Sequence, residues 1–102
     1  MLAAKYRLRN FQFPVFFEGA VKKNRKHLRI FQKSNTIGHP RFSIPIPKSL
    51  YKSSVMRNKI RRRIYEIIRT SIHNFSTEDY IIIPHKDISA LTQVDILHEL
   101  IS

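Results

Sequence analysis

Apolar residues recur at intervals of three and four between positions 55 and 69, and this stripe constrains the fold more than any other feature. On a helix they would share one side: Met56, Ile60, Ile64, Ile67 and Ile68. Ser53 or Ser54 can cap such a helix, which we expect to reach about Ile72. A chain of 102 residues has room for one domain with one modest core. The stripe therefore predicts a long helix packed on a sheet.

Three short runs have the composition of strands for that sheet: His27–Gln32, Arg41–Pro47 and Asp79–Pro84. In the first run, Leu28 and Ile30 fall on one face. In the second, Pro45 indicates an edge strand or a bulge, because proline cannot donate to a ladder. The residues 34–40 between these two runs form a predicted loop.

Two more helices complete the predicted order αββαβα. Residues 14–20 suit a short helix that starts at Pro14, and a last helix opens at Asp87 or Ser89 and runs to Ile101. We predict a small single-domain α/β (α+β) sandwich spanning 1–102, with residues 1–8 as a flexible basic N-terminus. A strand, the long helix and the next strand form a βαβ crossover in this arrangement.

The charge is strongly asymmetric along the chain. Residues 1–63 hold 17 of the 19 Lys and Arg residues and one acid, a net charge of +16, whereas residues 64–102 have a net charge of −4. Like charges that are concentrated in this way repel one another unless a polyanion neutralises them. The asymmetry favours a phosphate-rich partner over the alternative of a merely basic, well-solvated surface.

Other sequence features indicate the cellular compartment. The chain has no cysteine, which excludes a disulfide scaffold, a thiolate metal site and a cysteine nucleophile. It also has no apolar run near the ~20 residues that a membrane span needs, and no apolar segment follows the first basic residues as a secretory signal requires. We expect a cytoplasmic protein.

The most informative stretch lies at the start of the long helix, where residues 57–63 hold five cations in seven positions. At helical spacing these cations repel one another, and positive charge is disfavoured near a helix N-terminus. An RNA or DNA backbone would offset both penalties, because arginine binds phosphate with two parallel hydrogen bonds. The alternatives are a solvated charged face on an ordinary amphipathic helix and a helix that lies on a membrane surface.

The residues 57–63 (RNKIRRR), preceded by Val55 and followed by Glu66, resemble the RNR motif of the bacterial ribonuclease P protein subunit. The resemblance covers about residues 7–101. It includes three further segments: Arg41–Lys48, Asp79–Pro84, and Arg7-Leu8 with Val15-Phe16 and Gly19. Five residues depart from the family pattern: Ser49, Tyr51, Lys52, Ser54 and Tyr65, the last of which stands where the family usually has the final arginine of the motif.

The resemblance implies a subunit of a ribonucleoprotein endoribonuclease whose chemistry is carried by RNA. In this family a large RNA, with Mg²⁺ held mainly by that RNA and the substrate, removes the 5′ leader of precursor tRNA. The protein binds the catalytic RNA and the leader. The residues implied to contact the RNA subunit are Arg57, Asn58, Lys59, Arg61, Arg62 and Arg63. The resemblance also implies a left-handed βαβ crossover, an exception to the usual hand.

A second surface is suggested by aromatic residues near the start of the chain. Stacking on aromatic rings and cationic tracking of phosphates hold single-stranded RNA. Together with the family resemblance, this predicts a leader-binding cleft made by Arg9, Phe11, Phe13, Phe16, Arg29, Phe31 and Lys48. For Phe13 and Phe17 the alternative is a place in the core, which a domain of this size needs.

We expect no catalytic or metal-ligating residue in the chain itself. Its five histidines lack ligand spacing, and two glycines cannot form a phosphate-binding loop. A DNA-binding helix-turn-helix would need a helix where the strand-like residues 41–47 stand, so we expect no DNA partner. We also expect no membrane partner, because the apolar stripe of the long helix is needed for the core of so small a domain. The alternative function is a general or ribosomal RNA-binding protein without a role in tRNA processing.

Overall fold

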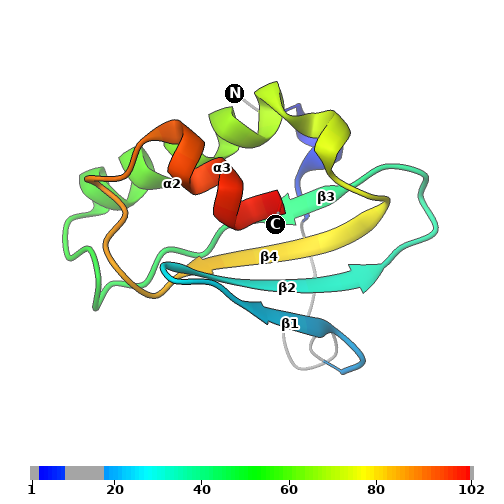
Figure 1. Cartoon of the computed structure of the whole chain (residues 1–102), viewed down its shortest axis with the longest axis horizontal. Helices are drawn as coiled ribbons and strands as arrows, with labels where there is room; N and C mark the ends of the chain where they lie inside the picture. Colours follow the sequence, from blue (N-terminus) through cyan, green and yellow to red (C-terminus); the bar gives the residue numbers. More distant parts are fainter. Residues whose placement is uncertain (1–2, 9–17, 102) are drawn as a thin grey trace.

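A four-stranded mixed sheet carries the fold in the computed structural model, which describes residues 3–8 and 18–101 (Figure 1). The strands are β1 (Val21–Asn24), β2 (Leu28–Ser34), β3 (Arg41–Ser43) and β4 (Glu78–Pro84). Their order in the sheet is β1-β2-β4-β3, with β3 parallel to β4 and the other pairs antiparallel. The helices are α2 (Ser54–Thr70) and α3 (Gln93–Ile101), with one-turn 3₁₀ helices η1 (Ala4–Tyr6) and η2 (Ile72–Asn74).

Helices α2 and α3 cover one face of the sheet and bury the main core against it (Figure 1). The predicted stripe is confirmed at four positions: Ile60, Ile64, Ile67 and Ile68 are buried. Met56, predicted to belong to the stripe, is instead 38% exposed, because it lies in the first turn, before α2 reaches the sheet. The Ser53 hydroxyl caps the helix by accepting from the Met56 amide at 3.4 Å.

The β3–α2–β4 segment is the predicted βαβ unit, because β3 and β4 are parallel neighbours on either side of α2 in sequence. The hand of this crossover stays a prediction of the family resemblance. The second predicted strand is shorter than expected and ends at Ser43, since Pro45 and Pro47 cannot donate to a ladder.

Two further differences from the predictions have local causes. β1 was not predicted, because Val21–Asn24 is a polar edge strand without apolar alternation. The last helix begins at Gln93, later than Asp87 or Ser89, because Thr92 and Asp95 form the cap by exchanging side-chain hydrogen bonds to each other's amides. Asp87 instead accepts from the Ser89 amide at 2.9 Å in the loop before that helix.

The other face of the sheet has a smaller apolar cluster. Leu8 and Ile81 are buried there, with Phe31 and Ile83 packed on them. The Leu8 amide donates to the Phe42 carbonyl at 2.8 Å, so residues 4–8 lie against β3, although the sequence suggests a flexible segment. Of the predicted helix over 14–20, residues 14–17 lie outside the described residues, and residues 18 and 19 form a turn.

Glu99 of α3 joins the C-terminal helix to the turn between β1 and β2. Its Oε1 accepts from the amides of His27 at 2.8 Å and Leu28 at 3.2 Å, and its Oε2 lies 2.7 Å from the His27 Nδ1. Both side chains are largely buried, at 16% and 13% exposed. The helix therefore fixes a turn 72 residues earlier in sequence. Within the described ranges, no helix is long and apolar enough to cross a membrane.

Candidate nucleic-acid interface

The cations of α2 fall into two groups that differ in what their side chains contact. Lys59 and Arg62 are exposed, as is Asn58. Arg57, Arg61 and Arg63 are partly buried, and each donates to backbone carbonyls of a neighbouring loop. The sequence pattern predicted one basic face and could not separate these roles.

Arg57 and Arg61 join α2 to the segment between β3 and α2. The Arg57 Nη1 donates to the carbonyls of Tyr51 at 2.9 Å and Lys52 at 2.8 Å. The Arg61 Nε donates to the Ile44 carbonyl at 3.1 Å, and its Nη1 donates to Asn58 Oδ1 at 2.8 Å. Because a guanidinium has five N–H donors, each arginine keeps donors for a further acceptor.

Arg63 holds the loop between β4 and α3. Its Nη1 donates to the Ile88 carbonyl at 3.0 Å and the Ser89 carbonyl at 3.4 Å, and its Nη2 donates to the Leu91 carbonyl. Three carbonyl partners make Arg63 a structural residue in addition to any role in RNA binding.

A hollow of about 780 Å³ lies along the exposed side of α2. Its lining is rich in cations and includes one acid: Arg7, Asn58, Lys59, Arg61, Arg62, Arg63, Tyr65 and Glu66. That acid stays ionised, because hydrogen bonds from the Arg69 guanidinium lower the pKa of Glu66 to about 2, and the charge of Arg69 offsets that of the carboxylate. The hollow therefore presents a positive surface to solvent, which suits a phosphate backbone.

Arg7 in this hollow was not among the predicted RNA-contacting residues. It comes from the segment beside β3, and its guanidinium lies 5.9 Å from the centroid of the Tyr65 ring on α2. Its Nε is buried and has no acceptor among the described residues. A buried donor without an acceptor costs about 1–3 kcal/mol, and more when the group is charged.

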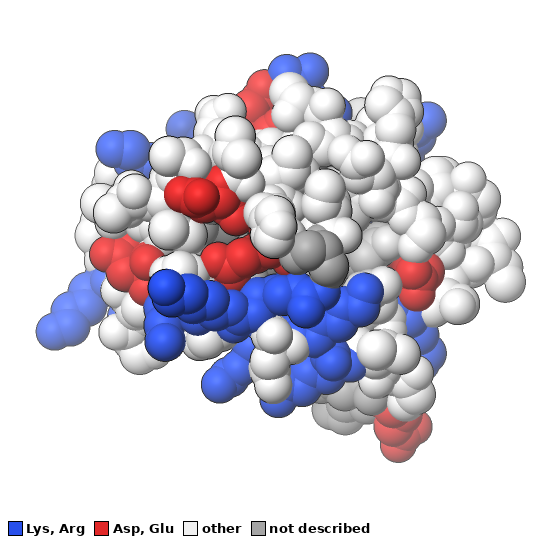
Figure 2. Space-filling view, in the orientation of Figure 1, with Lys and Arg blue, Asp and Glu red and all other residues white. Residues whose placement is uncertain are grey.

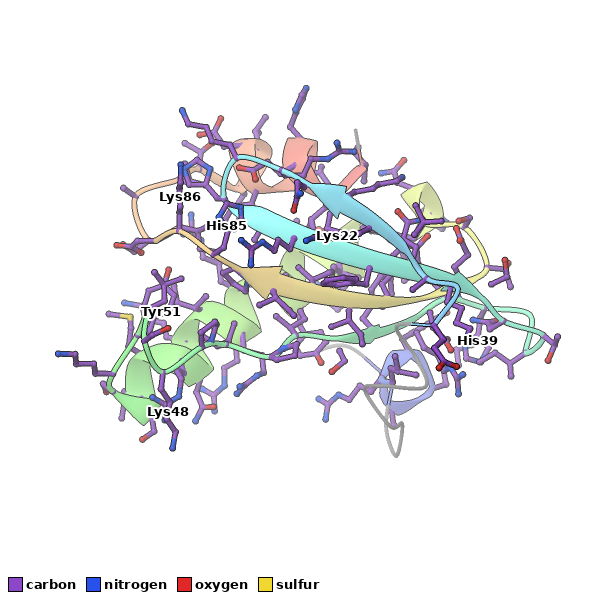
Figure 3. All side chains as sticks on the ribbon, turned by 90° about the horizontal axis from the view of Figure 1, so that it is seen from below. Lys22, His39, Lys48, Tyr51, His85 and Lys86 are labelled. Carbon is purple, nitrogen blue, oxygen red and sulfur yellow. The ribbon has the colours of Figure 1, made fainter. Side chains whose placement is uncertain are left out.

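The predicted leader-binding residues are only partly brought together. Arg29 and Phe31 share the sheet face opposite the helices, where Lys22 Nζ lies 5.9 Å from the centroid of the Phe31 ring. Figure 3 shows Lys22 over that face and Lys48 well apart from it, beside Tyr51 near the start of α2. The other four residues, Arg9, Phe11, Phe13 and Phe16, lie outside the described residues.

A second concentration of cations is visible in Figure 2, where Lys and Arg side chains form one band over β1 and its turn to β2. This part of the chain contributes Lys22, Lys23, Arg25 and Lys26.

Comparisons with known proteins show the family of this chain. A family model described as Ribonuclease P matches residues 2–102. The chain belongs to the ribonuclease P protein family. A ribonuclease P protein component of Buchnera aphidicola is 33% identical over 91 residues, which cover 89% of this chain and 80% of that protein.

Solved ribonuclease P proteins have the same fold. The protein from Staphylococcus aureus superposes with a TM-score of 0.79 at 25% identity, covering 93% of this chain and 88% of that one. The protein from Thermotoga maritima superposes with a TM-score of 0.81 at 21% identity, covering 92% and 90% of the two chains, and supports the fold alone.

One departure from the ribonuclease P pattern, Tyr51, has a structural role in this chain. Its side chain is only 7% exposed, and its hydroxyl donates to Asp87 Oδ1 at 2.7 Å and accepts from the Ile88 amide at 2.8 Å. Tyr51 thus fastens the segment before α2 to the loop that Arg63 holds. Burial, together with the Asp87 carboxylate, raises the pKa of Tyr51 to about 12.

This raised pKa predicts a pH dependence of stability. Because the folded state binds the Tyr51 proton more tightly than the unfolded state, the contribution is complete below the ordinary value near 10 and is lost as the pH rises to about 12. At pH 8 the Tyr51→Phe variant should be less stable than the wild type. Between pH 10 and 12, however, its free energy of unfolding should fall by about 1–3 kcal/mol less than that of the wild type. Urea unfolding of both proteins at each pH measures this, and parallel pH curves would contradict it.

Proposed function

We propose that the chain is the RNA-binding subunit of ribonuclease P, which binds the catalytic RNA through α2 and assists removal of the 5′ leader of precursor tRNA. The observation that carries the proposal is the cation-lined hollow along α2, in a chain that belongs to this family. Lys59 and Arg62 would pair with phosphates directly, while Arg57 and Arg61 would use the donors that their carbonyl contacts leave over.

The protein's part in this reaction is electrostatic. Two folded RNAs repel each other, and a surface with a net positive charge between them lowers the cost of bringing them together. We propose that Mg²⁺ is held by the RNA subunit and the precursor. Among the described residues, no group of three or more His, Asp or Glu side chains could hold a metal ion, and no step of the proposal uses a protein-bound ion. The proposal places the protein in the cytoplasm, where precursor tRNA is processed.

Reconstitution tests this function. The purified protein, mixed with a bacterial ribonuclease P RNA at low Mg²⁺, should accelerate multiple-turnover cleavage of precursor tRNA. A general RNA-binding protein would instead bind this RNA and an unrelated structured RNA alike and would leave cleavage unchanged. Unchanged cleavage at physiological Mg²⁺ would refute the proposal.

We also propose that the leader lies on the sheet face opposite the helices, across Arg29 and Phe31. The Phe31 ring packs at the edge of the small cluster around Ile81 and has Lys22 nearby, which is the combination of a stacking platform and a phosphate-tracking cation. Arg29 lies two residues from Phe31 on the same face of β2, so a single-stranded RNA leader could contact both side chains.

Phe31→Ala should weaken binding of leader-bearing precursor tRNA by the assembled enzyme. The loss of one base stack costs ~1–3 kcal/mol, which is roughly 5- to 150-fold in affinity. Mature tRNA, which has no leader, should bind as before. The matched control is Ile83→Ala, which removes apolar volume from the same cluster without an aromatic ring. Equal losses for the two RNAs, or for the two variants, would remove Phe31 from the leader path.

A further inference from the structure

Arg7 has an unusual environment for a cation that lies apart from the basic helix in sequence. Its Nε is buried and has no hydrogen-bond acceptor within residues 3–8 and 18–101. The backbone of Arg7 is fixed by a bridge to Phe42 of β3, and the next residue, Leu8, is buried. The side chain is therefore anchored at its backbone, and its Nε still lacks an acceptor.

The side chain is held from the other side by Tyr65. The guanidinium carbon lies 5.9 Å from the Tyr65 ring centroid, within the range of a cation–π contact, and both residues line the hollow along α2. Four other cationic side chains of that hollow come from the helix itself: Lys59, Arg61, Arg62 and Arg63. A guanidinium that is positioned beside other cations and whose Nε lacks an acceptor suits an anionic ligand, and the planar fork of arginine matches phosphate.

We propose that Arg7 is a phosphate-binding residue of this interface. It comes from the N-terminal segment and supplies the positive charge that is missing from α2 at position 65, where this chain has a tyrosine. This inference rests on the proposed function and adds to it a residue from outside the basic helix. The partner is the phosphate backbone of the catalytic RNA. Tyr65 acts as a positioning residue, since its ring holds the guanidinium over the hollow.

The test uses Arg7→Met in the full chain, because methionine fills the volume of the stem without a buried donor. Each lost duplex phosphate contact lowers the slope of log K against log salt by ~0.9, which corresponds to roughly 8-fold weaker binding at 0.1 M salt. We expect that loss for Arg7→Met, with a melting temperature of the free protein no lower than that of the wild type. Lys5→Met is the matched control, since Lys5 is exposed in the same segment and does not line the hollow.

A second substitution gives the decisive readout. In Arg7→Met/Tyr65→Arg the guanidinium returns to the hollow from α2, so the salt slope and the affinity should recover toward the wild-type values. A purely structural role for Arg7 predicts a lower melting temperature and no such rescue. The proposal is overturned if Arg7→Met and Lys5→Met have the same salt slope, or if the double variant binds no better than Arg7→Met.

The same titrations on a generic RNA duplex separate this proposal from the proposed function. If the wild type bound the duplex but did not favour the catalytic RNA, the function would fail, and the slopes of the Arg7 variants on the duplex would still decide the role of Arg7. A slope difference of ~0.9 between Arg7→Met and Lys5→Met on that probe would support the phosphate contact, and no difference would refute it.

Discussion

Charge reversal at the two exposed cations of α2, Lys59→Glu with Arg62→Glu, should weaken binding to the ribonuclease P RNA by more than ~60-fold at 0.1 M salt. Two lost phosphate contacts account for roughly that factor, and repulsion between each new carboxylate and the backbone adds to it. Both residues line the hollow, and no ion pair or side-chain hydrogen bond to either is found among the described residues. The loss should therefore come from the interface and leave the fold intact.

A salt titration of binding, with circular dichroism on the free protein, measures this prediction. If about five or six phosphates are contacted, the wild type should show a slope of roughly −4 to −5, and the variant should be flatter by about 2 or more. Lys5→Glu with Lys33→Glu is the control, since it changes the net charge equally outside the hollow. Equal slopes for the variant and the control would show that net charge alone governs binding.

The exposed pair is a better probe than Arg57→Ala with Arg61→Ala. Those two arginines donate to the carbonyls of Tyr51, Lys52 and Ile44, so their removal changes both the interface and the segment before α2. A loss of binding in that variant could not be assigned to phosphate contacts. For Lys59 and Arg62, a loss of affinity with unchanged helicity could be assigned to phosphate contacts.

Glu99→Ala should destabilise the protein by about 2–5 kcal/mol. The carboxylate accepts from two backbone amides of the β1–β2 turn and pairs with the His27 ring, and alanine leaves both amides without that acceptor. Each unsatisfied, largely buried group costs ~1–3 kcal/mol. Since a small domain is stable by only ~5–15 kcal/mol in total, this is a large fraction.

Denaturant unfolding of the free protein measures the change. Glu99→Gln is the matched control, because its amide oxygen can still accept from the amides of His27 and Leu28, and it should lose clearly less stability than Glu99→Ala. If the two variants were equally stable, the hydrogen bonds from the turn would not be the cause. A loss below ~1 kcal/mol for Glu99→Ala would show that water replaces the carboxylate.

Elements with a strong apolar period could be predicted from the sequence. Four of the five stripe positions of α2 and the buried strand β4 were correct, because burial on one side imposes a period that the residues display directly. β1 carries no such pattern, since an edge strand with exposed lysines depends on pairing with β2 for its structure. The start of α3 was misplaced because Asp87 and Ser89 use their hydrogen-bonding groups on each other in a loop.

The residues of the basic surface could be predicted from the sequence. Which of them are exposed and which donate to backbone carbonyls could not. Spacing puts Arg57, Arg61 and Arg63 near one another, yet their carbonyl partners come from loops up to 28 residues away. Arg7 was missed for the same reason, because its neighbour Tyr65 is adjacent only in the folded chain. The signal that could have suggested it was the absence of an arginine at position 65.

The contact between Glu99 and the β1–β2 turn has a consequence for synthesis on the ribosome. The two partners are separated by 72 residues, so at ~5–20 residues per second the turn is translated roughly 4–14 s before the carboxylate that holds it. By the end of that interval all 19 lysines and arginines have been translated, whereas the helix that completes the fold has not. Non-specific capture by nearby ribosomal or transfer RNA would then compete with folding.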